Sequence, residues 1–216
     1  MGTINGNVQK KFHFIYVWAI IEAVLIYTHV LILSALEKWN INKPFKLMIT
    51  FLPITLLVIN LVIVIINFKR LDRTVFLGCA VLIKYILIPL YIVGAAFMAL
   101  CFLLVFSPVV IMVFVAPVIA IAFTVYGWSV IVAVAPFSVA YMLKAKKEGA
   151  LPTLLTKIGI VTQFLFCIDV ITVMILAILR ERKWVKLTIV LLALLILCAL
   201  GIGGFITINI IKAFIS

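Results

Sequence analysis

Four ionisable side chains lie inside long apolar stretches of the sequence: Glu22, His29, Lys84 and Asp169. A charge placed in hydrocarbon costs about 2.5–3.5 kcal/mol on insertion scales. Each of these side chains therefore needs a partner, access to water or a function that justifies its position. Carboxylates in such surroundings mark proton, ion or solute sites, and they also lock helices together.

Asp169 is the most informative of the four. It lies 12 residues after Lys157 and 11 residues before Arg180, in the middle of the apolar segment that these two bases bound. Its short side chain cannot reach a membrane surface, so the carboxyl group must be protonated, paired or hydrated. Gln163 lies beside its helical face.

The other polar side chains fall at a similar depth if the chain makes six spans. Glu22, Asn60, Lys84 and Gln163 then lie in the cytoplasmic half of the membrane, with Asp169 at its centre. Lys84 between two carboxylates would leave the set nearly neutral. We therefore predict a buried network in which Lys84 pairs with Asp169 or with Glu22.

Each of these residues also has a structural explanation. Lys84 could extend its long stem to the surface, and Asn60 could form an interhelical hydrogen bond. His29 could face the outer interface. Glu22 and Asp169 could be a structural polar pair rather than a binding site.

The composition explains why these charges stand out. Of 216 residues, 68% are apolar and 11% are charged, whereas an ordinary soluble domain has roughly 25% charged residues. No soluble fold has enough interior for this much apolar surface. The sequence thus excludes a soluble globule, a disordered chain and a disulfide-rich secreted module. It predicts an all-α, multi-pass transmembrane helical bundle.

The net charge of +12 does not indicate nucleic acid binding. The basic residues form short clusters between the apolar stretches, as is typical of the loops of membrane proteins. Their expected partner is a lipid bilayer with anionic headgroups. A membrane-protein partner or a second copy of the chain is compatible with the same pattern.

A span needs about 20 apolar residues, and the whole chain is expected to form a single transmembrane domain. The six predicted spans are residues 13–36, 45–67, 75–106, 108–132, 157–180 and 185–211.

Residues 136–148 are expected to form a short interfacial helix, because Pro136 suits a first helical turn and Gly149 a stop. A seventh span that includes this segment is the alternative. Six spans put both termini on one side, and the excess of basic residues indicates that this side is the cytoplasm.

Motifs of soluble and membrane enzymes are absent. The sequence contains no HExxH, GxGD or GxSxG, and two histidines cannot build a His-rich metal site. No Gly-rich phosphate loop precedes a Lys-Ser/Thr pair. We expect no metal, no cofactor and no catalytic residue, although the question of enzymatic activity stays open.

Three short stretches carry a resemblance to a known family: residues 83–89 (IKYILIP), 136–141 (PFSVAY) and 163–170 (QFLFCIDV). Together they resemble a family of small, uncharacterised multi-pass membrane proteins of Gram-positive bacteria of the Firmicutes group. The similarity covers roughly residues 80–180. It implies a bacterial cytoplasmic membrane and no particular activity.

Two functions are compatible with these observations. The first is a small transporter or channel-like protein whose polar network of Glu22, Asn60, Lys84, Gln163 and Asp169 binds a proton, ion or small polar solute. Asp169 would be its titrating centre. The second is a non-catalytic accessory or scaffold protein that acts by packing its helices against a partner.

Overall fold

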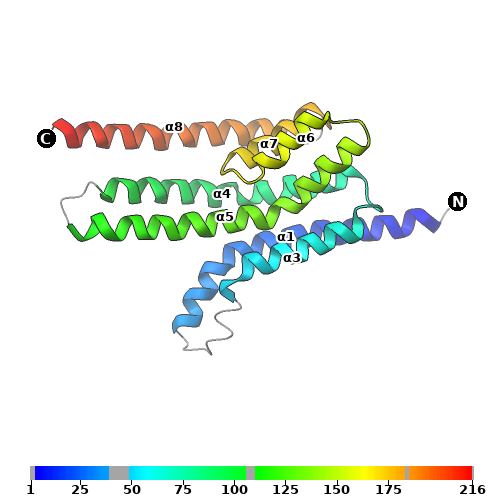
Figure 1. The fold of residues 1–216 in the computed structure, drawn as a ribbon, viewed down its shortest axis with the longest axis horizontal. Helices are drawn as coiled ribbons and strands as arrows, with labels where there is room; N and C mark the ends of the chain where they lie inside the picture. Colours follow the sequence, from blue (N-terminus) through cyan, green and yellow to red (C-terminus); the bar gives the residue numbers. More distant parts are fainter. Residues whose placement is uncertain (1–2, 39–48, 106–109, 183–184, 216) are drawn as a thin grey trace. The chain divides into compact units, whose positions relative to one another are not determined.

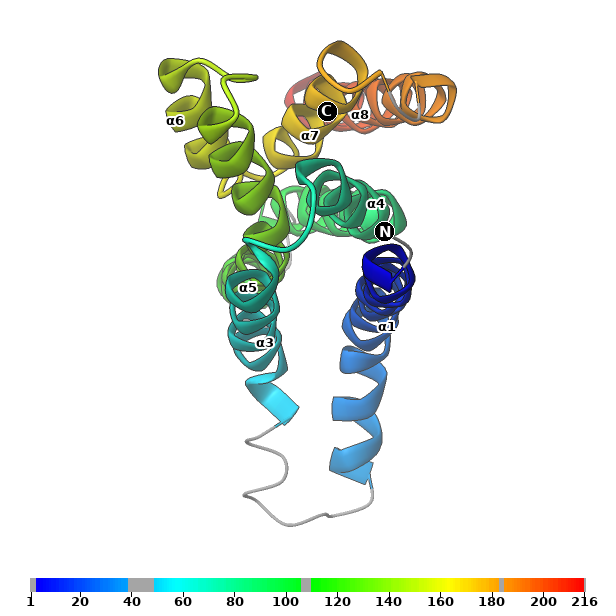
Figure 2. The ribbon, with the colours of Figure 1, turned by 90° about the vertical axis from the view of Figure 1, so that its right-hand side faces the viewer.

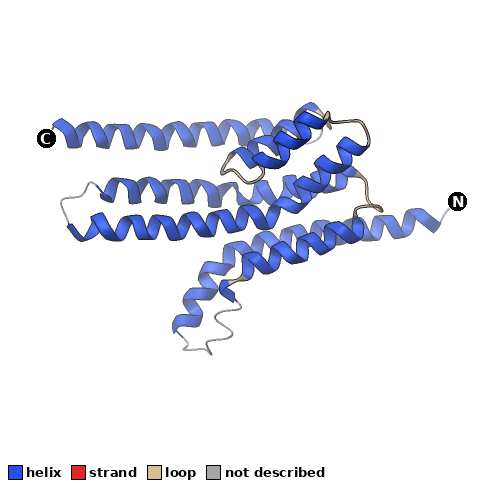
Figure 3. Ribbon diagram, in the orientation of Figure 1, coloured by secondary structure: helices blue, strands red, loops and turns tan. Residues whose placement is uncertain are grey.

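The computed structural model describes residues 3–38, 49–105, 110–182 and 185–215. Within these ranges the regular structure is entirely helical, as Figure 3 shows, so the predicted all-α class is confirmed for them. The helices are α1 (Thr3–Lys38), α3 (Leu52–Asn67), α4 (Arg73–Val105), α5 (Val110–Lys147), α6 (Thr153–Thr162), α7 (Ile168–Leu179) and α8 (Val185–Ile215).

The chain divides into two compact units. Unit 1 comprises Met1–Leu87 and Ser129–Lys183, and unit 2 comprises Ile88–Trp128 and Trp184–Ser216. The long helices α4 and α5 contribute to both units (Figure 1). In unit 2, Phe97 of α4 packs on Phe123 of α5, with ring centroids 4.5 Å apart.

The helices of unit 1 bury one stripe of residues each. On α3 the buried side chains recur every three or four residues, at Pro53, Leu56, Asn60 and Val64. The residues between them are exposed and equally apolar, for example Ile65 at 71% exposure. The helix is therefore apolar all round, as expected when the outer face does not meet water.

Two helices of the described chain are long and apolar enough to cross a membrane by length and composition: Arg73–Val105 and Ile111–Lys147. The same test finds shorter apolar segments of 10–17 residues in the other helices, among them Phe14–His29 within α1 and Val185–Gly201 within α8.

The expected interfacial helix at 136–148 is wrong. Helix α5 continues without a break through Pro136 to Lys147. Phe137 and Tyr141 are almost completely buried rather than lying on a surface. Proline costs a helix one hydrogen bond, and the burial of this apolar segment outweighs that loss.

A single continuous helix over the predicted span 157–180 is not found, because the structure places two helices there. Helix α6 ends at Thr162 and α7 begins at Ile168, with a turn between them. In the view of Figure 2, α6 and α7 appear as two distinct helices joined by a loop. Pro89 and Pro117 lie inside continuous helices. The predicted break at Ser107-Pro108 lies outside the described residues.

Candidate functional site

Lys84 and Asp169 form a completely buried ion pair, which confirms one of the two predicted pairings. The Lys84 Nζ donates to Asp169 Oδ2 at 2.8 Å, and neither side chain has any exposed surface. The same Nζ donates to Gln163 Oε1 at 2.7 Å. The Gln163 amide in turn donates to the backbone carbonyl of Gly159 at 3.2 Å. We call Lys84, Gln163 and Asp169 the lysine cluster.

Arg73, the first residue of α4, shows how the chain reaches this cluster. Its Nη1 lies 3.0 Å from Glu148 Oε2, just after α5. Its Nε lies 2.8 Å from Glu181 Oε1, just after α7. One guanidinium thus holds the residues that precede α6 and those that follow α7. The α6–α7 segment therefore returns to the end from which it started, and it is a helical hairpin rather than one continuous helix. We call this end of unit 1, marked by Arg73, Glu148 and Glu181, the charged end.

The spacing of the charges sets the depth of the ion pair. Lys84 lies 11 residues after Arg73, and Asp169 lies 12 residues before Glu181. At 1.5 Å per helical residue, both are about 16–18 Å from the charged end. The Arg73–Glu181 contact aligns α4 and α7 at the charged end. Lys84 and Asp169 lie at the same distance from that end, so the alignment brings them together.

The turn at residues 163–167 gives Asp169 a second stabilising contact. Cys167, at the N-terminal boundary of α7, has φ 62°, a left-handed conformation that non-glycine residues rarely adopt. Asp169 consequently lies in the first turn of α7. The positive end of a helix dipole there favours a carboxylate. In a single continuous helix this contribution would be absent.

The backbone of the turn is largely satisfied from within the hairpin. The amides of Gln163, Phe164 and Leu165 donate to carbonyls of the last turn of α6, at 3.1–3.2 Å. The amide of Asp169 donates to the Leu165 carbonyl at 3.1 Å. A turn with such internal hydrogen bonds can exist away from water, where an unpaired amide would be costly.

The lysine cluster leaves one polar atom unused. Asp169 Oδ1 is buried and has no hydrogen-bond partner among the described residues. An unsatisfied buried acceptor costs about 1–3 kcal/mol. The carboxylate is therefore able to accept one more hydrogen bond or to coordinate one small cation.

A second buried cluster forms between α1, α3 and α5, which we call the glutamate cluster. The Asn60 Nδ2 donates to Glu22 Oε1 at 2.6 Å and to the carbonyl of Ala133 at 2.8 Å. The indole of Trp18 donates to Asn60 Oδ1 at 2.8 Å. Glu22 Oε2, like Asp169 Oδ1, is buried without a partner.

The structure divides the predicted network into two. All five predicted residues are buried in unit 1. No hydrogen bond or ion pair between described residues links the lysine cluster to Glu22 or Asn60. The single five-residue network is therefore wrong, because Lys84 faces the hairpin whereas Glu22 faces α3. His29 makes a local contact, with Nε2 2.9 Å from the carbonyl of Ile49.

Sequence reasoning missed several residues that build the site. Trp18 is not among the predicted site residues, yet its indole orients Asn60. Arg73 and Glu181 border two different predicted spans, yet they form an ion pair. Arg73 and Glu181 lie 108 residues apart in sequence, and no local sequence pattern indicates such a contact.

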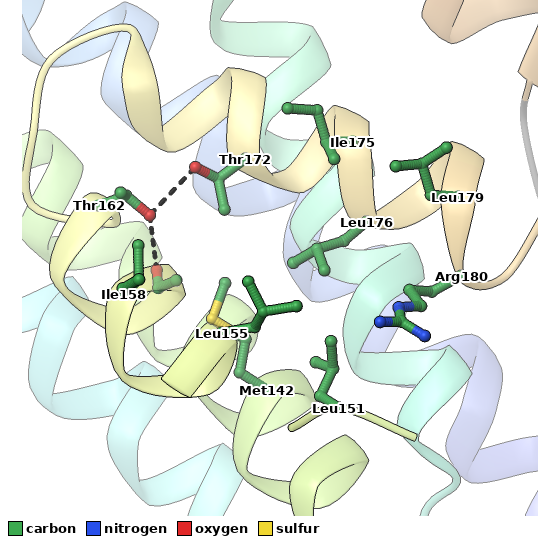
Figure 4. Close-up of a pocket in the computed structure, with 11 residues that line it drawn as sticks. Met142, Leu151, Leu155, Ile158, Thr162, Thr172, Ile175, Leu176, Leu179 and Arg180 are labelled. Atoms are coloured by element: carbon green, nitrogen blue, oxygen red, sulfur yellow. Dashed lines mark hydrogen bonds between the residues drawn. The ribbon is translucent and has the colours of Figure 1, made fainter. Parts of the chain in front are cut away.

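A groove runs along the hairpin between α6 and α7. It has a volume of about 290 Å³, and its walls are mainly aliphatic. Figure 4 shows the Thr162 and Thr172 hydroxyls, 3.0 Å apart, at one end and Arg180 at the other. Neither Lys84 nor Asp169 lines this groove.

The described part of the chain contains no group of three His, Cys, Asp or Glu side chains that could hold a metal ion. No family model matches the chain, and no curated protein or solved structure matches it either. The proposed function therefore rests on the geometry of the lysine cluster and the glutamate cluster.

Proposed function

We propose that the protein is embedded in a bilayer through five crossings, α1, α3, α4, α5 and α8, with the α6–α7 hairpin entering and leaving on one side. The exposed faces of the helices support this placement, since Phe114 and Leu200 are 71% and 70% exposed. Soluble monomers rarely expose large contiguous apolar patches. The hairpin helices of 10 and 12 residues are about 15–18 Å long, half of a hydrocarbon core of about 30 Å.

An odd number of crossings places the termini on opposite sides. This replaces the six spans expected from the sequence, which put both termini in the cytoplasm. The charged end carries the basic clusters at Lys69-Arg70 and Lys144-Ala145-Lys146-Lys147. The positive-inside rule then favours the cytoplasm for this end and for the N-terminus. A bacterial cytoplasmic membrane, as the family resemblance implies, remains part of this proposal.

Cysteine labelling from one side of the membrane tests the hairpin directly. Glu148→Cys and Arg182→Cys, each in a background without the four native cysteines, should react with an impermeant maleimide from the same side. A crossing helix at 157–180 would instead place these two positions on opposite sides. Labelling from opposite sides would overturn the hairpin and the five-crossing arrangement.

We further propose that the protein is a small transporter or channel-like protein, and that the lysine cluster binds a proton, ion or small polar solute. One observation carries this proposal: a broken helix delivers Asp169, whose Oδ1 has no partner among the described residues, onto Lys84. In the proposed placement the pair lies near the middle of the membrane. Transporters commonly build their sites from discontinuous helices near the midplane. Ionisable residues at that depth are functional candidates by default.

The residues have distinct roles in this proposal. Asp169 is the titrating or ion-binding group, and Lys84 is its counter-ion in the closed state. Gln163 holds the Lys84 ammonium in place from the turn of the hairpin. Glu22 and Asn60 form the second candidate site, where Glu22 has no cation among its hydrogen-bond partners and one free oxygen. A separation of the hairpin from α4 would open the lysine cluster.

Ion flux in proteoliposomes tests the proposal. The purified protein should conduct at least one of H⁺, Na⁺, K⁺ or Cl⁻ when each is driven by its own gradient. Asp169→Asn should reduce that flux at least ten-fold, whereas Thr172→Val, in the groove of the same hairpin and outside the lysine cluster, should preserve it. Absence of flux for all four ions, in protein that melts as cooperatively as before reconstitution, would overturn the proposal.

A non-catalytic accessory or scaffold protein is the second candidate, and the burial of the ion pair favours it. Lys84 and Asp169 have no exposed surface, as expected if the pair only fixes the hairpin against α4. The function would then lie in the exposed apolar faces, which would contact a membrane-protein partner or a second copy. The stability measurement developed in the Discussion separates the two candidates.

A further inference from the structure

The groove of the hairpin has chemically different ends. Leu151 and Leu155 face Leu176 and Leu179 across it, so its walls are apolar along most of their length (Figure 4). At the charged end the groove terminates at Arg180, whose side chain is exposed. The groove thus combines an apolar channel with one cation at its mouth.

Arg180 differs from the neighbouring Arg73 in having no counter-ion. The guanidinium of Arg73 is held by two carboxylates, Glu148 and Glu181. The guanidinium of Arg180 makes no hydrogen bond or ion pair with another residue of the described chain. Glu148 and Glu181 are thus engaged by Arg73, and Arg180 is available for an external anion.

The direction and length of the groove fit an acyl chain. It follows the hairpin inward from the charged end, the direction in which lipid chains run if the protein lies in a bilayer as proposed. The hairpin helices reach about 15–18 Å, the depth of one leaflet. The volume of about 290 Å³ is at the lower limit of ligand pockets, roughly 300–1,000 Å³.

We propose that the groove binds one acyl chain of an anionic phospholipid from the leaflet at the charged end, with the lipid phosphate on Arg180. A guanidinium offers a phosphate two parallel hydrogen bonds, which makes arginine well suited to this contact. The bound lipid would fill the space between α6 and α7 and hold the hairpin together. This inference depends on the proposed membrane placement but not on transport through the lysine cluster.

Lipid retention measured by native mass spectrometry tests the inference. The delipidated protein in neutral detergent is mixed with phosphatidylglycerol or phosphatidylcholine carrying the same acyl chains. We expect one phosphatidylglycerol to be retained in preference to phosphatidylcholine. Arg180→Gln should reduce that preference about five-fold, the effect of roughly one basic residue at a lipid surface. Lys157→Gln, on the exposed side of α6, should leave it unchanged.

A matched pair of substitutions tests the groove itself. Ile158 lines the groove and Val161 does not, although both are exposed positions on α6. Ile158→Trp should fill the groove and abolish retention of the lipid, whereas Val161→Trp should not. Both variants are expected to fold, because neither position is buried in the protein.

Three outcomes would overturn the inference. The first is equal retention of both lipids in every variant, and the second is equal loss in both tryptophan variants. The third is a lipid-free dimer, which would mean that a second copy covers the groove. Since no flux is measured, failure here leaves the transport proposal intact, and a failed flux assay leaves this one intact.

Discussion

The buried pair of Lys84 and Asp169 makes a quantitative prediction about stability. Its two charges are 2.8 Å apart and neither side chain is exposed. Removing one partner from a buried ion pair leaves an uncompensated charge, which typically costs about 3–5 kcal/mol. Replacing both partners removes both charges and is often close to neutral.

We therefore expect Lys84→Met and Asp169→Asn each to destabilise the protein by about 3–5 kcal/mol. For a chain of this size that corresponds to a fall in Tm of about 6–20 °C. The double variant should recover most of this loss, so that the coupling energy of the cycle is several kcal/mol and favourable. Thermal unfolding in one detergent, at one protein concentration, gives all four values of the cycle.

The half-exposed pair of Arg73 and Glu148 is the matched control. Glu148→Gln should cost at most about 1 kcal/mol, because solvent screens an exposed ion pair. If Lys84→Met and Asp169→Asn are as mild as this control, the buried pair is not a structural lock and our reasoning about its energetics fails.

The two outcomes have different functional meanings. Strong loss in the single variants with recovery in the double variant would identify a structural lock and favour the scaffold candidate over transport. Neutral or stabilising single variants would mean that the charges are kept at a cost to stability for another purpose. The transport candidate would then be favoured, and the flux measurements would decide it.

Two further predictions concern packing and the glutamate cluster. Gly159→Val should destabilise the protein by about 1–3 kcal/mol, because a Cβ atom there would lie 2.9 Å from Met142 Sδ. Gly94→Val is the control: a Cβ atom there has no neighbour within 4 Å, so this variant should be neutral in the same melting assay. Asn60→Leu should cost about 1–3 kcal/mol and shift the fluorescence of Trp18, whose indole loses its acceptor. An unchanged melting curve and spectrum would show that the glutamate cluster does not hold α1 against α3.

The sequence alone determined the helical class and the residues that matter most. Apolar stretches longer than 20 residues can satisfy their backbone only as helices when water is absent. The cost of a buried charge singled out Lys84, Asp169 and Glu22 without reference to a fold, although it left open whether Lys84 pairs with a carboxylate or reaches the surface. That reasoning was sufficient to predict the Lys84–Asp169 pair as one of two alternatives.

Only the tertiary structure decided which alternative holds and how the chain achieves it. Nothing in residues 163–167 is a local helix breaker, since the turn contains neither glycine nor proline. The break depends on contacts with distant residues: Arg73 holds both ends of the hairpin, and the Lys84 ammonium donates to Gln163 and Asp169 near its turn. Conversely, Pro89 and Pro136 lie within unbroken helices because packing outweighs their local preference. A sequence of apolar residues specifies helices well, but it does not specify where they reverse, because that depends on a few polar contacts between residues far apart in the chain.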